Sequence, residues 1–234
     1  MASPIAPGRP GTDRDPVGDE SSGPSACAGW LLVYRPMIAR CEGVVLSHGE
    51  MLRARFRDAK IGPAPPPWRP PAAAPRGIAV GGLLAVGFHT HPETGADLLL
   101  VASSRGRGLF DCATGERLAR DRADDYDEPD GPDLSCEGIG VLAGRRVRMA
   151  GLYGGGLHHV TPDAWTIRVV APAWPNQRVM LVHPFHEPAA DPDRGGWQVI
   201  YDDRPCELRA AGFAPSGNTL VVASSCDVVL FVRP

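Results

Sequence analysis

The stretch LLLVASSRGRGLFD at residues 98–111 and the stretch TLVVASSCDVVLFV at 219–232 are two versions of one pattern. Each has a run of leucine and β-branched residues, an Ala-Ser-Ser turn and a second apolar run that contains a phenylalanine. A short Gly-Phe segment precedes each of them, at 86–88 and at 211–213. Residues of high strand propensity on both sides of a short polar turn indicate a β-hairpin. The sequence therefore predicts a repeated antiparallel strand unit.

The matched residues of the two copies occur in the same order along the chain. They are Gly87 with Gly212, Phe88 with Phe213, Val101 with Val222, Ala102 with Ala223, Ser103 with Ser224, Ser104 with Ser225, and Phe110 with Phe231. The copies are offset by about 120 residues, about three times the 40 to 45 residues of a four-stranded propeller blade. This spacing predicts further, more degenerate units between them.

Beyond Gly77, short runs of leucine and β-branched residues are interrupted by glycine, proline, asparagine or aspartate. Such a texture is typical of an all-β protein. We therefore expect an all-β, mainly antiparallel fold with strands at 78–88, 98–104, 107–113, 166–171, 178–183, 197–201, 208–213, 219–225 and 227–233.

Two longer segments, 98–120 and 207–232, resemble blades of β-propellers of the WD-repeat or quinoprotein-like kind. In the first segment two strands are followed by the turn ATGE, and in the second the turn APSGN follows an aromatic residue. The resemblance implies a small or partial β-propeller over 77–234, with room for about four blades. The Gly-His opening and the Trp-Asp ending of WD repeats are missing. Segment 150–175 resembles an uncharacterised bacterial family, which implies no function.

Four regions of different composition divide the chain. Residues 1–27 are rich in Pro, Gly, Ser and Asp and bury too little apolar surface to offset the entropy of ordering, so we expect a disordered tail. Apolar residues return in 28–62, whose pattern fits two short strands or a strand and a short helix. The proline-rich stretch 63–76 predicts an extended linker. The propeller-like domain is expected at 77–234.

A partial propeller leaves sheet edges open, and open edges favour association unless they are covered. Two covers fit the sequence. Residues 43–58 could return to pair with the strand at Val228 to Val232, or a second copy of the chain could close the sheet. The second cover predicts a homo-oligomer.

The charge of the chain bears on its partners. With 24 basic and 27 acidic residues, the net charge is −3. No global positive field is therefore available to hold a nucleic-acid backbone or an anionic lipid surface. We expect neither nucleic acid nor a membrane as a partner.

Cysteine usage and the N-terminal residues bear on the compartment. The six cysteines are widely scattered and form no C-x-x-C pair, so we expect reduced thiols. The first 23 residues carry acidic residues and prolines where a secretory signal needs a basic start and an apolar stretch. The longest apolar run, 77–88, is shorter than the roughly 20 residues that span a bilayer. These features predict a soluble, cytoplasmic protein.

The segment HTHP at 89–92 supplies the candidate metal ligands, His89 and His91. It resembles the metal-binding core of JAMM-type zinc isopeptidases, in which two imidazoles and an aspartate hold zinc and a glutamate is the base. The family's Ser-x-x-Asp would begin at Leu100, so the acidic ligand is missing here. The resemblance implies a zinc site at His89 and His91 whose third ligand must come from elsewhere.

A second interpretation treats the same histidines as part of a turn. Strand alternation places His89 and His91 on one face, which suits a metal, and Glu42 or Glu50 could serve as the base. The repeat, however, aligns 89–97 with the shorter turn at 214–218. It therefore favours an enlarged hairpin turn.

Other motifs also have two interpretations. His158-His159 and His183 with His186 would form a zinc site only if the fold gathered them. The acidic stretch 121–133 offers carboxylates for calcium, but its glycine spacing does not fit an EF-hand, and a solvated loop is favoured. The glycine-rich stretch 151–159 lacks the spacing of a dinucleotide-binding turn, which favours a loop at a blade edge.

Three functions of different classes fit the sequence. The leading one is a non-catalytic interaction module that binds a protein partner through loops on a rigid β scaffold, because the sequence contains no catalytic constellation. The second is a zinc-dependent hydrolase built around His89 and His91. The third is a binder of a small ligand or carbohydrate that uses Trp165, Trp174 and Trp197.

Overall fold

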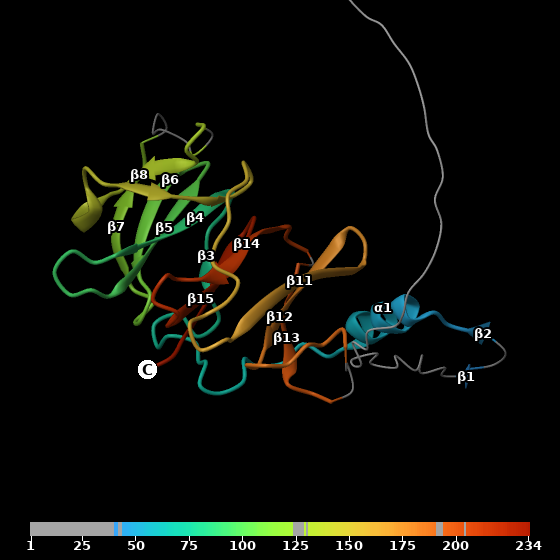
Figure 1. Ribbon diagram of the computed structural model, residues 1–234. Coiled ribbons are helices and arrows are strands. Elements are labelled where there is room, and N and C mark those ends of the chain that lie inside the picture. Colours follow the sequence, from blue (N-terminus) through green and yellow to red (C-terminus); the bar gives the residue numbers. More distant parts are fainter. Residues whose placement is uncertain (1–39, 42–43, 124–128, 130, 191–193, 204) are drawn as a thin grey trace, which may run out of the picture. The chain divides into compact units, whose positions relative to one another are not determined.

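The computed structural model describes residues 40–41, 44–123, 129, 131–190, 194–203 and 205–234 (Figure 1). These residues belong to one unit of the chain, Ile38–Pro234. The tail expected at 1–27 lies outside the described residues, as does the first part of the region 28–62.

The described strands form antiparallel sheets (Figure 1). The five-stranded sheet has the order β10-β4-β5-β6-β7, with β4 (Leu83–Thr90), β5 (Asp97–Ser103), β6 (Gly106–Asp111), β7 (Arg117–Asp121) and β10 (Ala150–Gly151). The four-stranded sheet has the order β14-β15-β16-β3, with β3 (Ile78–Ala79), β14 (Leu208–Phe213), β15 (Thr219–Ser224) and β16 (Asp227–Val232). The three-stranded sheet comprises β11 (Thr166–Ala173), β12 (Asn176–Val182) and β13 (Trp197–Asp202). Two short pairs join β1 (Arg40–Cys41) to β2 (Val44–Val45) and β8 (Ser135–Glu137) to β9 (Arg146–Arg148).

The described residues are mostly β, with one α-helix, α1 (His48–Asp58), and one short 3-10 helix, η1 (Gly140–Leu142), which confirms the all-β class. The sheets of the described part of the chain do not close into a barrel or a propeller. The sequence missed β7 to β10 because β7 is largely polar and the other three have only two or three residues each. The run expected at 78–88 is divided into β3 and β4 by a turn in which Gly82 has a φ of 68°.

The two stretches that share a sequence pattern also share a strand register. Phe88 of β4 lies opposite Leu99 of β5, and Phe213 of β14 lies opposite Leu220 of β15. On the other side, Leu99 and Leu220 face Phe110 of β6 and Phe231 of β16. The strands β4-β5-β6 and β14-β15-β16 therefore pair in the same register at these positions.

Three clusters of buried apolar side chains fill the space between successive sheets. One joins β11–β13 to β14–β16, the second joins β14–β16 to β4–β6, and the third joins β4–β6 to β8–β9. Alternate residues of β15 point into the first two clusters, and alternate residues of β5 point into the second and third. Both faces of β5 and β15 are therefore buried, which explains why these strands are almost wholly apolar.

The proline-rich stretch 63–76, expected to be an extended linker, lies against this core through Trp68. Trp68 is only 3% exposed, and its ring centroid lies 6.0 Å from that of Trp165 and 5.4 Å from that of Phe213. Arg69 exchanges two main-chain hydrogen bonds with Val232, of 3.0 and 2.8 Å. The prolines fix an extended backbone whether the segment is a linker in solvent or packs on the core. The apolar side chain of Trp68 decides that this segment packs rather than extends into solvent.

The outer edge of β16 is covered from within the chain, although not by residues 43–58. Ile78 and Ala79 of β3 pair with Val228 and Asp227 of β16. For the region 28–62 the sequence left open two strands or a strand and a short helix, and the described part of that region has β1, β2 and then α1. A capping box begins the helix, because Ser47 Oγ accepts a hydrogen bond from the main-chain N–H of Glu50 while the Glu50 carboxylate accepts one from the N–H of Ser47.

Arg178 of β12 anchors the C-terminal end of α1 to the three-stranded sheet. Its Nη1 donates hydrogen bonds of 2.8 Å to the carbonyl oxygens of both Phe56 and Ala59. Its Nε donates to the carboxylate of Asp202 at 3.0 Å. The Arg178 side chain is 10% exposed and that of Asp202 is 6% exposed. The Arg178 guanidinium, which is paired with Asp202, thus donates to carbonyl oxygens at the end of the helix that have no partner within it.

The matched glycines Gly87 and Gly212 are both covered by another segment of backbone. A Cβ atom at Gly87 would lie 2.3 Å from the carbonyl oxygen of Arg148, and one at Gly212 would lie 2.2 Å from the Cβ of Leu157. We expect Gly87→Ala and Gly212→Ala each to lower the free energy of unfolding by about 2 kcal/mol, through overpacking.

Urea unfolding measures this effect, with Gly81→Ala as the matched control. A Cβ at Gly81 meets nothing within 4 Å, so this variant should change stability by less than about 0.5 kcal/mol. Equal stabilities for the three variants would show that no backbone crosses these two strands.

Candidate functional site

Three strands that each end a sheet meet around one pocket. β10 is the last strand of the five-stranded sheet, β14 of the four-stranded sheet and β11 of the three-stranded sheet. The pocket between them has a volume of about 280 Å³. Its lining residues are Ala150, Gly155, Gly156, Leu157, His159, Val169, Gln177, Leu208, Arg209, Ala210 and Ala211.

The glycine-rich segment 151–159 forms one wall because it runs between two sheet edges. Phe213 of β14 donates a 2.7 Å hydrogen bond to the carbonyl oxygen of His158, and Ile167 of β11 donates one of 2.9 Å to that of His159. Gly155 has a φ of 82°, and a Cβ there would lie 2.2 Å from the carbonyl oxygen of Met149. Only glycine fits this conformation and this close approach.

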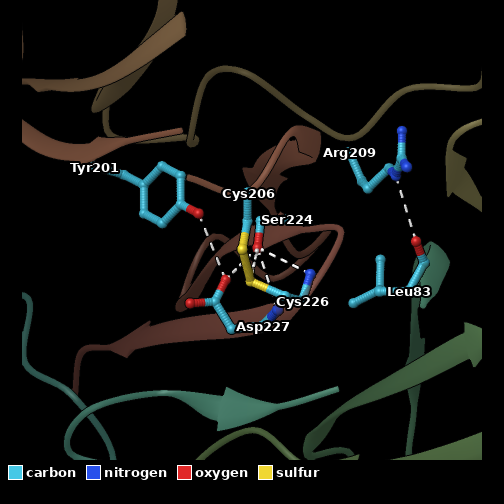
Figure 2. Close-up of a disulfide and its surroundings, with 7 residues drawn as sticks. All are labelled: Leu83, Tyr201, Cys206, Arg209, Ser224, Cys226 and Asp227. Carbon is cyan, nitrogen blue, oxygen red and sulfur yellow. Dashed lines mark hydrogen bonds between the residues drawn. A yellow bond between two sulfur atoms is a disulfide. The ribbon is translucent and has the colours of Figure 1, made fainter. Parts of the chain in front are cut away.

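Arg209 supplies the charge of the pocket. It lies in β14, between Leu208 and Ala210, where the register of pairing with β15 shifts. The pairing of β4 with β5 has a similar shift between Leu83 and Ala85. Its side chain is 14% exposed. Nε donates to the carbonyl oxygen of Leu83 at 3.3 Å, as Figure 2 shows, and Nη1 lies 3.0 Å from the Glu207 carboxylate. Within the described part of the chain, Nη2 has no hydrogen-bond partner.

Two further polar side chains share the pocket with Arg209. Gln177 is half-buried at the start of β12, and His159 is exposed on the loop before β11. Neither side chain bonds to another of the residues that the structure describes. The lining residues therefore combine one guanidinium, one imidazole and one amide, with no carboxylate and no thiol.

The predicted metal ligands His89 and His91 lie elsewhere, at the tip of the β4-β5 hairpin. His91 Nδ1 accepts hydrogen bonds of 3.2 Å from the main-chain N–H groups of Glu93 and Thr94, and His89 Nδ1 lies 2.8 Å from the carbonyl oxygen of Thr90. The His91 ring thus stabilises the turn. Across the described ranges, no group of three or more His, Cys, Asp or Glu side chains could hold a metal ion.

The other residues proposed for a zinc site do not meet at one place. Glu50 belongs to the cap of α1, and Glu42 lies outside the described residues. His183 and His186 flank a turn with ring centroids 6.1 Å apart. Burial lowers the pKa of His183, and the nearby His186 lowers it further.

The tryptophans proposed as a carbohydrate platform also lie apart. Trp165 is buried in the cluster between two sheets, and Trp197 makes an edge-to-face contact with Phe56 at 5.4 Å. Trp174 is 81% exposed at the turn between β11 and β12. None of the three lines the pocket.

Much of the acidic stretch 121–133 lies outside the described residues. Its two ends carry ion pairs, Asp121 with Arg107 and Asp133 with Arg146. The hydrogen bond from the main-chain N–H of Ala123, followed by that from Arg107, lowers the pKa of Asp121. These end carboxylates therefore serve local structure.

A disulfide joins Cys206 to Cys226, so the expectation of reduced thiols is wrong for this pair (Figure 2). Spacing could not reveal it, because the β14-β15 hairpin brings together cysteines that are 20 residues apart in sequence. Cys112 and Cys136 are free and buried. Burial raises the pKa of the Cys112 thiol well above its ordinary value.

The disulfide ties the start of β14 to a turn that is itself held by a serine. Ser224 Oγ accepts hydrogen bonds from the N–H groups of Cys226 and Asp227, at 3.3 and 3.1 Å, and also binds the Asp227 carboxylate (Figure 2). Tyr201 donates to the same carboxylate at 3.5 Å, and burial raises the pKa of Tyr201. The segment that carries Arg209 is therefore fixed at its base.

Comparison with known proteins finds no matching family model, no matching curated protein and no matching solved structure. A search of the described helices for a long apolar one finds none that would cross a membrane.

Proposed function

We propose that this protein is a non-catalytic binding module whose binding site is the pocket between β10, β11 and β14. In this proposal the sheets act as blades of an open, propeller-like arrangement. The observation that carries it is the convergence of three edge strands on one pocket, as the inner strands of propeller blades line a central channel. Its volume of about 280 Å³ lies near the lower end of the range of about 300–1,000 Å³ for ligand pockets.

The chemistry of the pocket supports binding rather than hydrolysis. With one imidazole and no carboxylate or thiol, its lining residues provide neither a zinc ligand set nor an acid–base pair. In this proposal, the group that enters the pocket belongs either to a small molecule or to a protein partner. Two exposed aromatic side chains outside the lining of the pocket, Trp174 at 81% and Phe185 at 96%, offer separate apolar surface to a protein partner.

The disulfide bears on the proposed location. A cytoplasmic protein keeps its thiols reduced, whereas a structural disulfide persists in an oxidising compartment. We therefore propose that the oxidised chain works outside a reducing cytoplasm, and that a cytoplasmic chain would have Cys206 and Cys226 as thiols.

A fragment screen by amide-detected NMR tests the proposed site. We expect a subset of small polar fragments to shift the amide signals of Gly155, Gly156 and Ala210. Gly156→Phe should abolish these shifts, because an added side chain at Gly156 meets open space at the pocket and no backbone strain.

Gly81→Phe is the matched control for this screen. Gly81 has the same open surroundings but lies outside the pocket, so its phenylalanine variant should keep every shift. Fragments that bind Gly156→Phe as well as they bind the parent chain would place the binding site elsewhere and reject the proposal.

A further inference from the structure

We infer that the pocket recognises a small ligand through an oxyanion group, a carboxylate or a phosphate, held by Arg209. This inference rests on the proposed function, since it names the chemistry of the ligand that the same site takes. It follows from three features: an excess of hydrogen-bond donors, a cation in the pocket with unused donors, and a small volume.

Hydrogen-bond donors dominate the side chains around the pocket. Arg209 is the one charged residue among the lining residues, and Gln177 and His159 add further N–H groups. The main-chain N–H groups of Gly155 and Gly156 donate to no main-chain carbonyl in the described part of the chain. Backbone N–H groups in a loop of this kind form concave sites for anions. A ligand that enters this pocket therefore finds donors and a positive charge.

The guanidinium of Arg209 is fixed but not saturated. Its contacts to the Leu83 carbonyl and the Glu207 carboxylate use Nε and Nη1, whereas a guanidinium has five N–H donors. Glu207 is 68% exposed, so its charge is largely screened by water. The N–H groups of Nη2 have no hydrogen-bond partner within the described part of the chain, so they can donate to an oxyanion in the pocket. Because the two contacts hold the guanidinium plane in place, the ligand would not have to order it.

The volume limits the ligand to a small molecule. At about 280 Å³, the pocket holds an oxyanion and a short polar remainder, which Gln177 and His159 can contact. A planar guanidinium binds the oxygens of a carboxylate and of a phosphate equally well in geometry. The proposed ligand group is therefore an oxyanion, the group that both kinds of ligand carry.

Titration with sodium acetate and with sodium phosphate, each as a separate probe, tests this inference on the full oxidised chain. We expect at least one anion to produce saturable shifts of the Gly155 and Gly156 amides at constant ionic strength. Arg209→Gln should weaken the apparent affinity at least about tenfold, since it removes a charge-assisted contact. Saturation by acetate alone assigns a carboxylate ligand, by phosphate alone a phosphorylated one, and by both the shared oxyanion chemistry.

Arg76→Gln is the matched control, because Arg76 is exposed and lies outside the pocket. It should leave both titrations unchanged. If Arg209→Gln does not fold, Gly156→Phe replaces it and should abolish the same shifts. Shifts that persist in the pocket variants, or no saturable shift in the parent chain, overturn the inference. If neutral fragments still bind at Gly155 and Gly156 in that case, the binding module stands and only the oxyanion is rejected.

Discussion

Arg178→Leu should lower the free energy of unfolding by about 4 kcal/mol. The substitution removes the Arg178 guanidinium from the Asp202 carboxylate, which is only 6% exposed. It also removes the donor that satisfies the carbonyl oxygens of Phe56 and Ala59. Urea unfolding gives the size of the loss, and amide hydrogen exchange should show faster exchange throughout α1.

Two further variants separate the ion pair from other causes. Arg168→Leu on the neighbouring strand removes an exposed pair with Glu187, whose side chains are 51% and 49% exposed, and should cost less than about 1 kcal/mol. Adding Asp202→Asn to Arg178→Leu should restore part of the stability, because the buried charge that has lost its contact with Arg178 disappears. A loss for Arg178→Leu no larger than that for Arg168→Leu would contradict the anchoring of α1.

Removal of the Cys206–Cys226 disulfide by Cys206→Ala together with Cys226→Ala should lower the free energy of unfolding by about 3 kcal/mol, the value expected for a closed loop of this length. The cross-link spans 20 residues and encloses all of β14 and β15. The denatured chain therefore gains conformational freedom when the bond is absent. Urea unfolding with and without a dithiol reductant measures the difference.

The double variant is its own control, because the reductant should not destabilise it further. Alkylation followed by peptide mass spectrometry should find Cys206 and Cys226 protected in the native chain until reduction. Immediate alkylation of both residues in protein purified under oxidising conditions would show that the bond does not form, and the proposed location outside a reducing cytoplasm would lose its support.

Most long strands could be predicted from the sequence because their apolar character has a local cause. β5 and β15 are buried on both faces, so each reads as an uninterrupted apolar run. The short strands β8, β9 and β10 carry too few residues for any periodicity. The role of Trp68 could not be predicted either, since the prolines around it permit both an extended linker and a segment packed on the core.

The candidate site was only partly visible in the sequence. The glycine-rich segment 151–159 was recognised as a loop at a sheet edge, and it forms one wall of the pocket. Arg209 carried no signal, because one arginine in an apolar strand matches no motif. His89 and His91 carried a strong motif signal, yet the bonds of His91 serve a hairpin turn.

The sequence by itself determined the all-β class and the positions of the main strands. These features depend on side-chain pattern along a few consecutive residues. Only the tertiary structure decided which edges meet, that Cys206 reaches Cys226, and that Arg209, Gln177 and His159 share one pocket. Such contacts join residues distant in sequence, and the packing of whole sheets against one another fixes them, which no local pattern encodes.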